Sequence, residues 1–290
     1  MALPFIPSDA GLLALQAAVV AAPRPMPRAA RLSRIHGRGW ALVPIGSIVV
    51  VVFAIRYVSD TATGLTWLAL IAVPLLAAAA LGWAARGSRP WAALLAIPLF
   101  LLAWLDKTSL VGEASGALLS ALSCVTLGVL LAAVTPRAWL KAGIVLMAAA
   151  DTWLVVSDLL QAPNAALVAA HPPAGLPKLQ GEIFGTVTMG YGDLFVAGLL
   201  GAVLAAQWRR QWRAALLTFA IAALFDLLFL VIAELPATVP VALALLITEG
   251  WETVSGSRRA PASLQVSGTP LRARPRNPRL RIRRSPRSVR

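Results

Sequence analysis

The sequence predicts an all-α fold, a polytopic transmembrane helix bundle of about eight spans. Hydrophobic residues occupy 59% of the 290 positions and charged residues only 13%, and the mean hydropathy is +0.77. These values lie outside the range of a soluble globular domain. We therefore expect an integral protein of the plasma membrane, with its outer surface in contact with membrane lipid.

Eight apolar segments are long enough, or nearly so, to cross about 30 Å of hydrocarbon at about 1.5 Å per residue. The third and eighth are short, so we expect them to be tilted less than average or partly unwound. An earlier run, Gly11 to Ala22, is too short for a span and is interpreted as interfacial or disordered. The expected spans are Trp40 to Val58, Thr63 to Ala85, Pro90 to Leu105, Ser115 to Val134, Ala138 to Leu160, Ile183 to Ala206, Arg213 to Ala233 and Pro236 to Glu249.

Basic residues occur before the first span and in every second loop, whereas the other loops carry few charges. By the positive-inside rule, eight spans with both termini cytoplasmic satisfy every loop. Residues 1–39 would form a basic cytoplasmic segment and residues 40–134 the first four helices. The basic residues on the expected cytoplasmic side are Arg24, Arg28, Arg31, Arg34, Arg38, Arg86, Arg89, Arg137, Lys141, Arg209, Arg210 and Arg213.

Residues 251–290 form an arginine-rich tail. No acidic residue follows Glu252, and eleven arginines lie between Arg258 and Arg290. Such a composition cannot bury a core, so we expect a disordered segment. The tail could bind RNA or anionic lipid, but a cytoplasmic tail that obeys the positive-inside rule is favoured, without a specific nucleic-acid partner.

The sequence offers little for a metal or cofactor site. Cys124 is the single cysteine and lies in an apolar run, and the two histidines, His36 and His171, lie in separate polar stretches. Neither a cysteine- or histidine-based metal site nor a Ser-His-Asp arrangement is expected. We predict no cofactor.

Two carboxylates lie inside apolar segments. Asp151 is near the middle of the fifth segment, and Asp193 follows Gly190, Tyr191 and Gly192 in the sixth. An Asp at the centre of a membrane helix costs roughly 2.5 to 3.5 kcal/mol, which indicates a functional role. If both segments are helical, the two side chains lie roughly 14 and 15 Å from the outer helix ends and therefore face each other in depth. Such a pair shares a proton, so that one acts as a base and the other as an acid.

The order of these residues resembles the GxGD intramembrane aspartyl proteases, which include presenilin and signal peptide peptidase. That family places one catalytic Asp in one helix, the second in a Gly-x-Gly-Asp motif on the next, and a Pro-Ala-Leu motif near the start of the last. The resemblance covers Ala138 to Glu249 and makes residues 135–250 the catalytic helices. It implies hydrolysis of peptide bonds within transmembrane segments of other proteins, with Asp151 and Asp193 as the catalytic residues. Active-site backbone and substrate contacts would come from Gly190, Tyr191, Gly192, Pro236, Pro240, Val241, Ala242 and Leu243, the two prolines disturbing the eighth helix.

Two other functions use the same residues. Thr188 to Asp193 resembles the selectivity filter of a potassium channel, but the apolar run resumes at Leu194, where a filter needs a polar exit loop. A proton- or cation-coupled transporter would use Asp151, Asp193 and Asp226 as a relay, although no inverted repeat is visible. A buried, protonated structural Asp is the alternative for Asp226, and Asp158 is expected to snorkel at a helix end.

Overall fold

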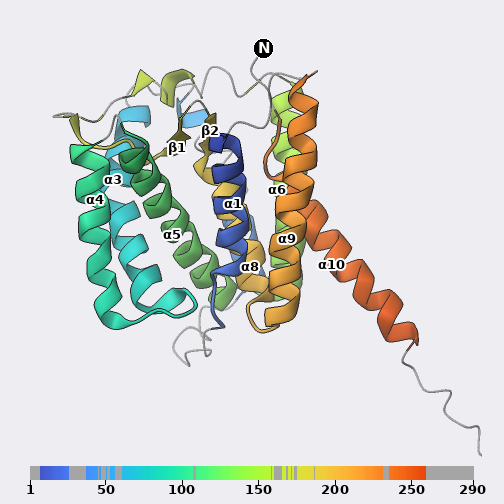
Figure 1. The fold of residues 1–290 in the computed structure, drawn as a ribbon. Helices are drawn as coiled ribbons and strands as arrows, with labels where there is room; N and C mark the ends of the chain where they lie inside the picture. Colours follow the sequence, from blue (N-terminus) through green and yellow to red (C-terminus); the bar gives the residue numbers. More distant parts are fainter. Residues whose placement is uncertain are drawn as a thin grey trace, which may run out of the picture.

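The chain folds into a mostly helical bundle with a small β-hairpin at one end (Figure 1). This computed structural model describes residues 7–25, 37–44, 46, 50, 53–55, 61–106, 109–157, 159, 165–167, 169–170, 172, 175–185, 187–230 and 235–258. Nine of the nineteen residues of the first expected span, Trp40 to Val58, lie outside these residues.

Several of the helices begin or end in a short 3₁₀ or π-helical segment. In chain order they are α1 (Pro7–Ala21), η2 (Arg38–Leu42), α3 (Thr61–Ala79) with a π-helical extension η3 (Ala80–Ala84), η4 (Pro90–Leu95) leading into α4 (Ala96–Leu105), α5 (Leu110–Val134), α6 (Arg137–Val156), α8 (Tyr191–Leu204), α9 (Trp208–Phe225) with η6 (Asp226–Leu230), and α10 (Val239–Arg258). The two strands, β1 (Gly181–Phe184) and β2 (Val187–Gly190), are antiparallel.

Four described helices are long and apolar enough to cross a membrane, and they correspond to expected spans. They are Thr61–Ala84, Leu110–Val134, Arg137–Val156 and Trp208–Leu228. Four shorter apolar helices lie beside them: Pro7–Ala21, Pro90–Leu105, Tyr191–Leu204 and Thr238–Gly250. A helical membrane protein is thus supported, whereas the count of eight spans is not confirmed.

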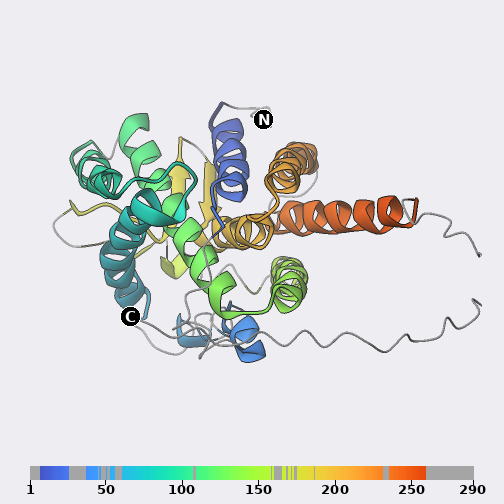
Figure 2. The same cartoon turned by 90° about the horizontal axis from the view of Figure 1, so that it is seen from below.

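The first helix corrects the interpretation of Gly11 to Ala22 as interfacial or disordered. This segment belongs to α1, which packs against α8, α9 and α5 with Leu12, Val19 and Val20 in the main core. The helix lies along one side of the bundle (Figures 1 and 2), with Ala10, Ala14 and Ala18 exposed on its outer face. A Cβ added to Gly201 of α8 would overlap the Val20 carbonyl oxygen, so the two backbones are in direct contact. The segment is thus helical and not disordered, while its length stays below that of a spanning helix, as expected.

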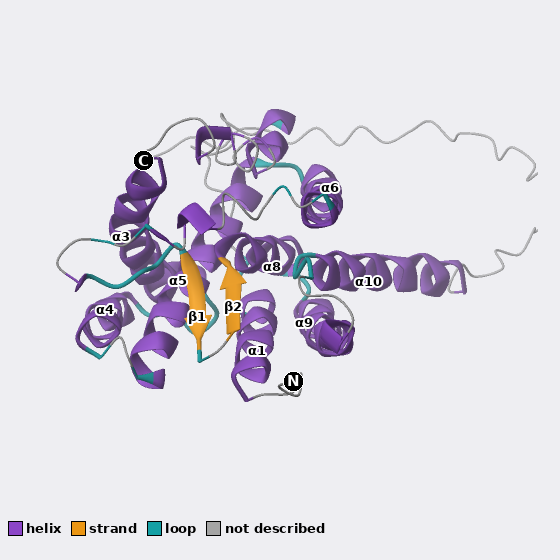
Figure 3. Cartoon of the chain, turned by 90° about the horizontal axis from the view of Figure 1, so that it is seen from above, coloured by secondary structure: helices purple, strands orange, loops and turns teal. Residues whose placement is uncertain are grey.

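The sixth expected span is also corrected. Ile183 to Ala206 is not one helix, because its first part forms β1 and β2 and only Tyr191–Leu204 is helical. Gly185, with φ of 62°, supplies the left-handed turn residue between the strands. Figure 3 shows β1 on the side of α5 and β2 next to α1; β1 contacts both α5 and α1, and β2 contacts α1 and α8.

Helices α5 and α8 form the centre of the bundle through small residues. A Cβ on Gly128 of α5 would lie 2.5 Å from the Gly198 backbone of α8, and one on Gly198 would overlap the Cys124 carbonyl oxygen. Small residues at such a crossing let the backbones approach closely, as in membrane helix pairs that lack a hydrophobic driving force. This contact fixes the start of α8, which carries Asp193, against α5.

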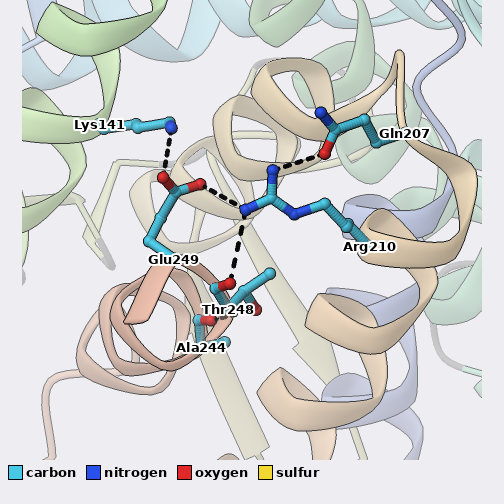
Figure 4. A network of polar contacts seen from close by, with 6 residues as sticks. All are labelled: Lys141, Gln207, Arg210, Ala244, Thr248 and Glu249. Atoms are coloured by element: carbon cyan, nitrogen blue, oxygen red, sulfur yellow. Dashed lines mark hydrogen bonds and ion pairs between the residues drawn. The ribbon is translucent and has the colours of Figure 1, made fainter. Parts of the chain in front are cut away.

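Described basic residues gather at the end of the bundle opposite the hairpin. Arg86 donates to the Ala205 carbonyl and to Gln211 Oε1, while Gln211 Nε2 donates to the Val20 and Pro23 carbonyls. At this end Glu249 of α10 pairs with Lys141 of α6 at 2.6 Å and with Arg210 of α9 at 3.1 Å (Figure 4). Beyond these two ion pairs of Glu249, α10 extends away from the other helices (Figure 2).

Candidate functional site

Asp151 lies in the second half of α6, where it meets the start of the last helix. The Thr238 hydroxyl donates to Asp151 Oδ2 at 2.6 Å. Thr238 is only 5% exposed and immediately precedes α10. The bond therefore ties the proline-containing run before α10 to the first candidate catalytic carboxyl.

Asp193 occupies the first turn of α8. Its Oδ2 accepts the Gly190 backbone N–H at 3.1 Å, which caps the helix and leaves Gly190 extended at the end of β2. Its carboxyl interacts electrostatically with that of Asp151. The structure thus brings together two carboxyls that are 42 positions apart in the sequence.

Both carboxyls lie well inside the bundle along its length. At 1.5 Å per residue, Asp151 is about 21 Å along α6 from Arg137 and Asp193 about 16 Å along α8 from Leu204. Arg137 and Leu204 are near the basic end, so both carboxyls fall within about 30 Å of hydrocarbon if that end lies at a membrane surface. Asp193 lies in the first turn of α8 and not, as expected, in the middle of a continuous helix that begins at Ile183.

The glycine motif is a junction between a strand and a helix. Gly190 ends β2 and Tyr191 begins α8, where its hydroxyl shares a hydrogen bond of 2.6 Å with the Ser123 hydroxyl of α5. A Cβ on Gly190 would lie 3.2 Å from Asp193 Oδ2, whereas one on Gly192 would meet nothing within 4 Å. Only Gly190 is therefore required to be small by the site itself.

The proline run lies beside the two carboxyls, but it does not interrupt the last helix as expected. Pro240 is the second residue of α10, a position where the missing N–H costs no helical hydrogen bond. Pro236 precedes the helix, and its carbonyl accepts from the Val239 N–H. Val241 and Ala242 are buried and Leu243 is half-buried within the first turns of α10.

A cavity of about 110 Å³ lies next to Asp193 and is large enough for several water molecules. Helix α1, strand β2, helix α9 and the segment before α10 surround it. Its lining comprises Asp9, Leu12, Leu13, Gln16, Val187, Thr188, Met189, Asp193, Ala222, Phe225, Asp226, Leu235, Pro236, Ala237 and Pro240. Water for hydrolysis can therefore reach one of the two carboxyls.

Sequence reasoning missed three of the polar residues at this site: Asp9, Gln16 and Thr238. The first two belong to α1, which was set aside as too short to span. A polar Gln within an otherwise apolar run was the available signal. Thr238 carried none, because threonine is common in apolar helices.

The remaining candidates fall elsewhere. Asp158, His36 and His171 lie outside the described residues. Within the described part of the chain, no three His, Cys, Asp or Glu side chains come close enough together to hold a metal ion. Cys124 is buried in the α5–α8 contact, with its thiol directed to the Tyr191 carbonyl at 3.8 Å.

Comparison of the chain with protein-family models, with curated proteins and with solved structures gives no match. The fold alone therefore defines the class to which this chain can be assigned. Its apolar helices are consistent with a helical membrane protein. A function must be argued from the site.

Proposed function

We propose that this protein is an intramembrane aspartyl protease that hydrolyses peptide bonds within transmembrane segments of other proteins. The observation that carries the proposal is the pairing of Asp151 on α6 with Asp193 on α8, with Thr238 donating to Asp151. Two carboxyls near enough to interact electrostatically favour a state that holds one proton between them. That state supplies a base and an acid at the same place.

The reaction needs both forms. The ionised carboxyl removes a proton from water as the water oxygen adds to the scissile carbonyl carbon, and the protonated carboxyl gives its proton to the carbonyl oxygen. The resulting diol collapses when the C–N bond breaks and the leaving nitrogen accepts a proton. One water molecule is consumed, and the pair returns to its starting protonation state.

Strand β2 offers a way to hold the substrate. It is an edge strand of a two-stranded sheet, and Val187, Thr188 and Met189 line the cavity that also reaches Asp193. A substrate helix must be opened before hydrolysis, because its carbonyls are hydrogen-bonded within the helix. An extended segment paired with β2 would have its backbone bonds satisfied and a carbonyl near Asp193.

The conformation of the glycine motif favours hydrolysis over potassium conduction. A filter uses successive carbonyls of an extended backbone to replace the hydration shell of the ion. Here Tyr191, Gly192 and Asp193 form the first turn of α8, and the Tyr191 hydroxyl is bonded to Ser123. The carbonyls of these three residues belong to a helical turn and are therefore not arranged as successive ligands of an ion.

We place the basic end of the bundle in the cytoplasm by the positive-inside rule. Helix α10 then runs toward the cytoplasm. Helix α1 runs in the same direction, because it begins at the hairpin end, with Ser8 beside Gly185, and ends beside Arg86. In this orientation Pro7 lies on the outer side, opposite to the cytoplasmic side expected for the N-terminal segment.

The test is cleavage of single-span reporter proteins in reconstituted vesicles by the wild type and by Asp151→Asn and Asp193→Asn. The proposal requires that each substitution abolish cleavage, while Asp106→Asn, which removes an exposed carboxyl at the end of α4, does not. Potassium and proton flux are recorded on the same vesicles. Flux without cleavage, lost on substitution of Gly190 or of Asp193, would replace the protease with a channel or a transporter.

A further inference from the structure

Two carboxyls of the cavity have no role in the proposed hydrolysis. Asp9 at the start of α1 and Asp226 at the end of α9 both line it, and the two interact electrostatically. Asp226 is only 8% exposed. No hydrogen bond or ion pair is formed by either side chain within the described part of the chain. A buried carboxyl beside a half-buried one, with no cation between them, is costly, which indicates a missing positive partner.

Gln16 gives a second, independent indication. Its side chain is 0% exposed and lines the same cavity. Its Nε2 donates to the Ala237 carbonyl at 2.9 Å, which fixes the orientation of the amide. The other atom, Oε1, is buried and has no partner among the described residues. An amide oxygen held in this way is an acceptor that lacks a donor.

The polar lining therefore consists almost entirely of acceptors. Carboxyls of Asp9, Asp193 and Asp226 and the amide oxygen of Gln16 are present. Among the described residues that line the cavity, Thr188 carries the only hydroxyl and none is Lys or Arg. A ligand complementary to it carries positive charge and several N–H donors. A primary ammonium group has three such donors on a compact head. The cavity volume of about 110 Å³ suits the end of a lysine side chain.

We propose that Asp9, Gln16 and Asp226 form a subsite for an ammonium group, supplied by a lysine of the bound substrate segment. This inference rests on the proposed proteolysis. Because the subsite shares its cavity with Asp193, a lysine seated there places the neighbouring backbone beside the catalytic carboxyls. The protein would thus prefer substrates with a lysine at a fixed distance from the cleaved bond.

Binding is tested first without any substrate. The thermal unfolding of the detergent-solubilised full chain is followed in n-butylammonium chloride and in choline chloride at equal ionic strength. A ligand that binds the folded state raises Tm with concentration. We expect n-butylammonium, but not the bulky choline cation, to raise Tm of the wild type and of Asp106→Asn, and to lose this effect in Asp226→Asn and in Asp9→Asn. No shift in the wild type, or an equal shift in all four proteins, overturns the subsite.

Potassium chloride distinguishes a free cation from a substrate side chain. A potassium effect equal to that of n-butylammonium, also lost in Asp226→Asn, would assign the subsite to an inorganic cation and overturn the lysine assignment.

Cleavage tests the substrate assignment. Reporters that carry Lys or Met at successive positions of the same segment are compared by kcat/KM. At one position we expect the Lys-to-Met ratio to fall about tenfold to a hundredfold in Asp226→Asn, as for loss of a hydrogen bond to a charged group, and to be kept in Asp106→Asn. A ratio that is the same in all proteins refutes the preference. If the wild type cleaves no reporter yet shows the n-butylammonium shift, the proteolysis and the lysine preference fail while the ammonium site stands.

Discussion

Thr238 offers the sharpest test of how the site is built, because its hydroxyl, together with its backbone N–H, links the segment before α10 to Asp151. Thr238→Val keeps the shape of the side chain and removes only the donor to Asp151 Oδ2 at 2.6 Å. The side chain is 5% exposed, so water cannot easily replace it. A hydrogen bond to a charged acceptor contributes about 1.5 to 3 kcal/mol, which corresponds to about tenfold to a hundredfold in kcat/KM if the bond acts in the transition state.

The assay is reporter cleavage in vesicles, with kcat and KM measured separately and Tm recorded on the same preparations. Thr238→Ser restores the hydroxyl without the methyl group and is the matched control. We expect Val to lower kcat within the range above and Ser to stay within about threefold of the wild type. Equal losses in Val and Ser would assign the role of Thr238 to packing of its methyl group. Full activity in a folded Thr238→Val protein would refute the argument that this bond orients Asp151.

Four further substitutions, in three tests, examine the frame around the site. Gly190→Ala places a Cβ 3.2 Å from Asp193 Oδ2, so kcat should fall roughly tenfold as the carboxyl shifts. The Cβ of Gly192→Ala meets no atom within 4 Å, so kcat should fall much less. Similar losses of kcat in both variants would contradict the geometry. Gly198→Ala forces a Cβ into the α5 backbone, and we expect this overpacking to destabilise the protein by about 1–3 kcal/mol. The expected result is a lower Tm in detergent. An unchanged Tm would disprove the close contact. Gln211→Leu removes the partner of the Val20 and Pro23 carbonyls and of the Arg86 side chain, which costs about 1–3 kcal/mol for each buried group. We expect proteases to release the α1 segment at a lower temperature than in the wild type. Resistance equal to that of the wild type would show that other contacts hold the helix.

Much of the helical frame was predictable, because a membrane-spanning helix must satisfy its backbone internally and present apolar side chains throughout. The amino-acid composition of a segment therefore reveals such a helix. Helix α6 begins and ends within a few residues of its expected positions, and α5 ends as expected but starts earlier, at Leu110. The hairpin was not predictable by the same rule. Ile183 and Phe184 are as apolar as a membrane helix requires. The left-handed backbone conformation of Gly185, which ends β1, cannot be predicted from hydropathy.

The candidate dyad illustrates the same division. The types of Asp151 and Asp193 and their place in apolar runs were enough to propose a pair, because an isolated carboxylate in hydrocarbon is too costly to be incidental. The sequence by itself thus determined a helical membrane protein with two candidate acidic residues. Only the tertiary structure decided that α1 enters the bundle, that Thr238 meets Asp151, and that Asp9, Gln16 and Asp226 share a cavity with Asp193. These are contacts between segments far apart in the chain, and they depend on helix packing through glycines such as Gly198 and Gly201, whose partners no local pattern specifies.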